Sequence, residues 1–118
     1  MHLTPMRLRF RFHVDDHAKY GADWTVYDEA ALIRLPVRQL IELESSTGMS
    51  IREMMARLRG DFLDGYLAAS WIAQKLAEKA IPDFDEYEPM AVLMEWEPAP
   101  AGDADPPEQP ASPSSSEA

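Results

Sequence analysis

The chain has 118 residues, a formal net charge of −10 and no cysteine. A chain of this length is expected to form one domain with a modest core, and the lack of cysteine excludes disulfides and thiol chemistry. The negative charge argues against nucleic acid as a partner, because phosphate binding needs clustered lysine and arginine. Since no apolar run is long enough for a signal peptide or a membrane span, we expect a soluble intracellular protein.

The N-terminal part predicts two short strands. Residues 6–14 alternate between apolar side chains and a row of basic ones, and a period of two indicates a half-buried strand. Residues 23–27 are typical of a second strand, so residues 6–27 are expected to form a β ribbon that packs on helices. The basic row holds Arg7, Arg9 and Arg11. We interpret this row as a solvated face or as edge protection rather than as a nucleic-acid stripe.

His13 and His17 flank two aspartates, a pattern that suggests a metal site. The spacing would align the two imidazoles only on a helix, whereas a turn is expected after the first strand. A zincin motif also needs a glutamate directly after the first histidine and a third ligand. The sequence therefore predicts no metal site. The following segment, residues 29–35, is compatible with either a helical turn or an extended connector.

The middle of the chain predicts two helices, at about residues 36–47 and 50–59. Pro36 suits a first helical residue, and Gly48 suits a helix end. Ser50 and Glu53 have the spacing of a capping box at the start of the second helix. The apolar residues of that helix recur at the spacing of one helical face, and they are Ile51, Met54, Met55 and Leu58.

A third and longer helix is expected at residues 61–80, with Asp61 as its cap and Pro82 beyond its end. Apolar and small residues cover more than half of its circumference, which is wider than the stripe of a surface helix. Trp71 is the exception, because it projects from the charged wedge of the helix. With links of two to four residues, the three helices are expected to pack antiparallel as a small three-helix core.

The C-terminal part predicts a short helical segment near residues 84–96 and then a tail. Residues 83–88 are acidic, but they lack the glycine and the closing glutamate of a calcium loop. From Pro98 the chain is rich in proline, serine and acids, with no basic residue. Such a segment cannot bury enough apolar surface to offset its ordering entropy. We therefore expect one mainly α domain over residues 1–97 and a disordered, solubilising tail over residues 98–118.

No catalytic constellation can be assembled from the sequence. The serines lie at predicted helix caps or in the tail, and no base is placed to activate them. The glycines are scattered and form no phosphate-binding loop. Paired carboxylates occur where helix capping already explains them. The sequence therefore predicts a protein that is not an enzyme and that holds no cofactor.

Residues 23–96 carry a series of motifs in a distinctive order. They are WTVYDEAALIRLP, LIELESSTGMS with its Glu44-to-Gly48 spacing, and AASWIAQKLAEKAIPDFDEYE, in which an alanine-rich helix leads into Pro-Asp-Phe-Asp. In this order and spacing the chain resembles the tail assembly chaperones of long-tailed bacteriophages, especially those of actinobacteria. Endings rich in proline and acids are also common in that family, whereas the basic strand at residues 6–14 is less typical.

The resemblance implies a non-enzymatic role. Such proteins bind the long helical tape measure protein, keep it soluble before the tail tube polymerises around it, and then leave. It implies a location in the host cell cytoplasm and absence from the mature virion. In many members a ribosomal frameshift also yields an extended product, so that product and the chain itself are further candidate partners.

The expected partner-facing patch centres on an exposed Trp71, since tryptophan is frequent in binding hot spots. Its other members are Ala68, Lys75, Lys79, Met54 and Met55. Methionine side chains repack easily around varied apolar partners. The alternative is that the N-terminal ribbon or residues 84–96 cover Trp71, because tryptophan is mostly buried in folded proteins.

Two other functions fit the composition. An acidic DNA mimic or host inhibitor would need carboxylates spread in a phosphate-like array, yet many of them lie at helix starts. A minor structural component of the virion, such as a head-to-tail connector, would remain in the particle, whereas a chaperone would leave.

Overall fold

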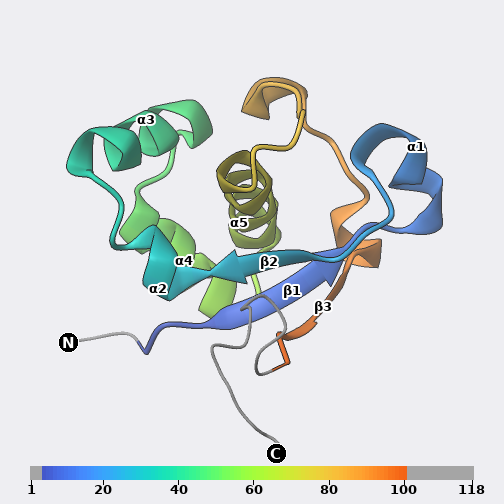
Figure 1. Ribbon diagram of the computed structural model, residues 1–118, viewed down its shortest axis with the longest axis horizontal. Coiled ribbons are helices and arrows are strands. Elements are labelled where there is room, and N and C mark those ends of the chain that lie inside the picture. Colours follow the sequence, from blue (N-terminus) through green and yellow to red (C-terminus); the bar gives the residue numbers. More distant parts are fainter. Residues whose placement is uncertain (1–3, 101–118) are drawn as a thin grey trace, which may run out of the picture.

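A computed structural model describes residues 4–100 of the chain (Figure 1). Its strands are β1 Arg7–Arg11, β2 Thr25–Asp28 and β3 Glu95–Pro98. Its α-helices are α1 His17–Tyr20, α2 Glu29–Leu32, α3 Val37–Thr47, α4 Ile51–Arg59 and α5 Leu63–Leu76. Three short 3-10 helices complete it: η1 Val14–Asp16, η2 Phe84–Glu86 and η3 Ala91–Leu93. The fold is mainly α with a small antiparallel sheet, as the sequence predicts.

The predicted N-terminal ribbon is confirmed, and a third strand extends it. β1 lies in the middle of a sheet with the order β2-β1-β3, antiparallel to both neighbours. Between β1 and β2 the chain makes the helical turns η1 and α1. On the inner face of the sheet Phe10 is fully buried and stacks on Trp96 of β3, with ring centroids 4.7 Å apart.

The short helical segment expected near residues 84–96 is present as 3-10 turns, but its last two residues belong to a strand instead. That segment contains only the two turns η2 and η3, and from Glu95 the chain is extended beside β1. The apolar run that ends at Met94 obscured the alternation of Glu95, Trp96 and Glu97, in which only the tryptophan turns to the core. Pairing with a strand 88 residues away, as between Arg9 and Glu97, cannot be inferred from local pattern.

The arginine row of β1 lies on the outer face of the sheet and is paired across the strands. Arg9 donates to Glu97 at 2.7 Å, and Arg11 donates to Glu95 at 2.8 Å. Both guanidinium groups also lie over the ring of Trp24, 4.1 and 4.6 Å from its centroid. The row is thus a solvated face, as the first of the two predicted alternatives states, and its positive charge is largely neutralised by these carboxylates. The other alternative, edge protection, is wrong because β1 is the central strand.

α4 and α5 form the closest helix pair in the fold. The apolar face predicted for α4 is confirmed, because Ile51, Met54, Met55 and Leu58 are all buried. Ser50 caps α4 by accepting the Glu53 N–H at 2.9 Å, as expected for this spacing. The two helices meet at Gly65, where a β-carbon would lie only 2.6 Å from the Leu58 amide nitrogen. Glycine is therefore required at this crossing.

α3 begins at Val37 rather than Pro36, which is its N-cap, and it ends at Gly48 in the left-handed conformation. Leu43 is the one residue of this 11-residue helix that is buried. In Figure 1 α3 stands at one side of the molecule, apart from the sheet. The third member of the predicted helical trio is thus attached much more lightly than α4 and α5.

α5 is shorter at both ends than the predicted helix at 61–80. Asp61 has φ 66° and does not cap the helix; Phe62 holds the N-cap position without a side-chain bond. At the other end Glu78 has φ 60°, and the Lys79 amide donates to the Gln74 carbonyl. This is the hydrogen bond of a Schellman motif, which usually uses glycine. The sequence offers no glycine there, so the early helix end was not predicted.

The expectation of disorder from residue 98 onward is wrong for the first residues of that range. Pro98 belongs to β3, and the Ala99 amide donates to the Arg7 carbonyl at 3.0 Å. The ordering entropy of these residues is offset because they extend an existing sheet. The rest of the expected tail, residues 101–118, lies outside the described residues.

Candidate interaction surface

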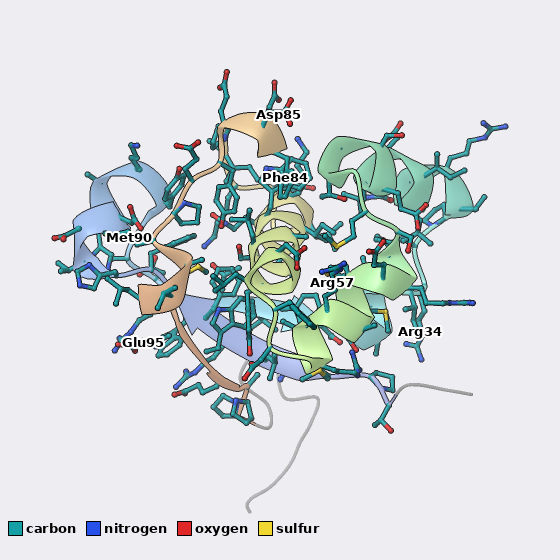
Figure 2. The ribbon with its side chains drawn as sticks, turned by 180° about the vertical axis from the view of Figure 1, so that it is seen from behind. Arg34, Arg57, Phe84, Asp85, Met90 and Glu95 are labelled. Atoms are coloured by element: carbon teal, nitrogen blue, oxygen red, sulfur yellow. The ribbon has the colours of Figure 1, made fainter. Side chains whose placement is uncertain are left out.

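Trp71 is 2% exposed, which corrects the expectation that it faces a partner. Its indole Nε1 donates to the Pro82 carbonyl at 2.9 Å. Phe84 packs edge-on against its ring, with centroids 5.7 Å apart. Figure 2 shows Phe84 in the η2 turn, close to the end of α5. The early end of α5 lets the chain fold back, so Trp71 is covered by this segment, in line with the alternative that residues 84–96 cover it.

The other members of the expected patch do not form a surface with Trp71. Ala68, Met54 and Met55 are buried in the hydrophobic core. Lys75 is exposed, and its Nζ lies 5.4 Å from the Trp71 ring centroid. Lys79 is also exposed, and it donates to the Thr25 hydroxyl at 2.7 Å. With four of the six residues buried, the patch is not available as a docking surface in this structure.

An open groove runs along α5: it lies between α5 and α3 over most of its length, and between α5, α2 and β2 at one end. Three adjoining depressions make it, of about 240, 490 and 310 Å³. Leu76 lines both the first and the second, while Lys75 and Ser46 line both the second and the third. The groove therefore follows one side of α5 from the edge of the sheet to η2.

The chemical character of the groove changes along its length. Its β2 end is apolar, and its lining there includes Tyr27, Leu32, Ile72, Ala73 and Leu76. The middle combines Leu43 and Ile41 with the polar side chains of Gln39 and Glu42. At the η2 end Lys75 stands beside Asp83 and Asp85. An apolar floor with a polar rim is the usual character of a surface that binds an amphipathic helix.

Sequence reasoning missed this groove apart from Lys75 and Trp71, which both line its η2 end. A signal for it does exist, because the predicted helix at 36–47 has more apolar residues than one contact can bury. In the structure Val37 is 68% exposed and Ile41 is 54% exposed. These two side chains lie one turn apart on α3. Ile41 lines the groove, whereas Val37 lies outside it.

The buried ionisable groups serve the fold. Glu29 is fully buried and accepts hydrogen bonds from Tyr27 at 2.6 Å and from Arg59 at 2.6 and 3.0 Å. Burial alone would raise the pKa of Glu29, but the hydrogen bonds from Arg59 and Tyr27 outweigh it and hold the pKa below its usual value. Burial raises the pKa of the Tyr27 hydroxyl. Because these groups satisfy one another, they form a structural network that ties α4 to the sheet.

A second buried network joins α5 to the segment after it. The Tyr87 hydroxyl lies 2.7 Å from Ser70 Oγ and accepts the Gln74 amide N–H at 2.9 Å. Burial raises the pKa of this hydroxyl, so it stays protonated. Ser70 is thus occupied within the core and has no neighbouring base, which argues against nucleophilic chemistry at this position.

Residues 4–100 contain no group of three side chains that could hold a metal ion. His13 and His17 do not converge: His17 Nε2 lies 3.1 Å from the Phe12 carbonyl oxygen, and His13 Nδ1 accepts the Asp15 amide. Within the same part of the chain, no helix has the length and apolar character needed to cross a bilayer.

Comparisons of the chain with protein-family models, with curated proteins and with solved structures find no match.

Proposed function

We propose that this protein is a tail assembly chaperone that binds a tape measure protein and keeps it soluble before the tail tube forms. The proposal rests on the resemblance of residues 23–96 to that family and on one structural observation. That observation is the open groove between α3 and α5, with its apolar end at β2. It replaces the Trp71 patch as the candidate site.

The client that fits such a groove is an amphipathic helix. A tape measure protein is a long helical protein with many apolar segments, which would aggregate if they were left uncovered. In the groove an apolar helix face would contact Leu76 and Leu43, while the polar rim would stay in contact with water. Because α3 buries little of its own surface, its local unfolding free energy is expected to be low, and the groove can adjust to different segments.

The experiment is co-expression of this chain with a tape measure protein, the client that the proposal names. Ala31 and Ala77 line the apolar end of the groove and are both exposed, so Ala31→Glu and Ala77→Glu should leave the fold intact. Each places a charge where the client's apolar face would lie. We expect both variants to lose most of the soluble client that the unmodified chain maintains.

The matched control is Val92→Glu, which adds the same charge at a 75% exposed apolar residue outside the groove. It should keep the client soluble. Equal client solubility with the groove variants and with the control would contradict the proposal. Mass spectrometry of purified particles tests the rival connector role, since a chaperone should be absent from them.

A further inference from the structure

Val37 and Ile41, one helical turn apart, form an exposed apolar strip on α3. The strip adjoins the groove, because Ile41 and Glu42 also line the middle of the groove. The adjacent positions on the helix hold Arg38 and Glu42, both exposed. Among the described residues neither makes an ion pair. Arg34 precedes them, and Figure 2 shows it at the surface on this side of the molecule. The face therefore combines exposed apolar side chains with an arginine and a glutamate that form no ion pair within the described part of the chain.

We infer that this face binds a second copy of the same chain, with the two α3 helices packed antiparallel about a twofold axis. The charges of α3 are ordered along the helix, with arginine toward its start and glutamate toward its end. Antiparallel packing therefore sets Arg38 opposite Glu42 of the second copy, and the twofold axis repeats this pair. The same arrangement brings the Val37–Ile41 strip of one copy against the Val37–Ile41 strip of the second copy. An isologous interface requires this kind of self-complementarity.

The packing of helices supports the same geometry. Val37 and Ile41 form a ridge with a spacing of four residues, and such ridges interdigitate when two helices cross at about −50°. A crossing of this kind covers only a few turns, so the interface is small and we expect weak, reversible association. Residues 101–118 of the chain are not a suitable occupant, because they have four acids and no large apolar side chain.

The inference does not depend on the proposed function, and its test uses the purified chain alone. Sedimentation equilibrium over a wide concentration range should show the unmodified protein shifting from monomer to dimer. Arg38→Glu and Glu42→Arg each set two pairs of like charges across the interface, so each variant should stay monomeric over the range in which the unmodified chain dimerises. An equimolar mixture of the two variants restores opposite charges at both pairs and should form a heterodimer.

Arg52→Glu is the matched control, because it changes net charge as Arg38→Glu does at an exposed position on α4. It should dimerise as the unmodified chain does. Circular dichroism of each variant checks that α3 remains folded. A chain that stays monomeric at all concentrations, an Arg38→Glu variant that dimerises as strongly as Arg52→Glu, or a mixture that stays monomeric would each overturn the inference. Because the groove variants test client binding separately, failure here leaves the proposed function standing.

Discussion

Replacing Gly65 by alanine tests the close approach of α4 and α5. The added methyl carbon would lie 2.6 Å from the Leu58 nitrogen and 2.7 Å from the Arg57 carbonyl carbon. These are backbone atoms, so the helices must separate by most of an ångström. Overpacking of this kind costs about 1–3 kcal/mol, and rigid backbone neighbours favour the upper end. Alanine's higher helix propensity returns about 1 kcal/mol, so we expect a net loss of about 2 kcal/mol.

For a domain of this size such a loss lowers the melting temperature by roughly 10 °C. Thermal and urea unfolding followed by circular dichroism would measure it. Gly60→Ala is the control, because the one tight contact of its methyl would be with the ring of Phe62, which is half exposed and can turn away, while the Ala56 carbonyl oxygen lies at an ordinary 3.6 Å. Its stability should change by less than about 0.5 kcal/mol. A Gly65→Ala variant as stable as the unmodified chain would refute the proposed crossing of these helices.

Three further predictions concern stability. Glu78→Gly should stabilise the protein by about 1 kcal/mol in urea unfolding, because glycine adopts the left-handed conformation without a steric cost. Tyr87→Phe should destabilise it by about 1–3 kcal/mol in the same assay, since Ser70 and Gln74 lose a buried partner. The folded-state pKa of Glu29 is lowered, so its contribution is complete above the usual glutamate pKa near 4.5 and is lost as pH falls through the lower folded value. Stability measured against pH should therefore fall below about pH 4.5, and Glu29→Gln should flatten that acid limb.

Much of the fold could be predicted from local sequence patterns. The capping spacing from Ser50 to Glu53 and the apolar period of α4 placed that helix within one residue of its observed start, because both signals act within a few residues. The alternation of residues 6–14 likewise identified β1 and its solvated face. Such predictions succeed where tertiary contacts reinforce a preference that the local sequence already has.

The parts of the fold that could not be predicted depend on contacts between segments far apart in the sequence. β3 needs β1 as its neighbour, and Trp71 is covered because α5 ends at a non-glycine residue in the left-handed conformation, which residue type does not indicate. The prediction of an exposed patch around Trp71 was wrong for this reason. Helical periodicity shows which side of a helix is apolar, but it does not show which later segment of the chain will lie on that side. The α3–α5 groove exists because α3 makes few contacts with the rest of the fold. The only sign of this in the sequence is the excess of apolar residues on that helix.

The position of β1 between β2 and β3 has a consequence for synthesis of the protein on the ribosome. The sheet cannot be completed until Glu95–Pro98 have been translated, so β1 waits with one edge unpaired while most of the polypeptide emerges. An unpaired strand edge is a template for wrong pairing, and contacts between sequence-distant segments form slowly. Nascent chains stalled before residue 95 should therefore be more prone to aggregate than those released after residue 100.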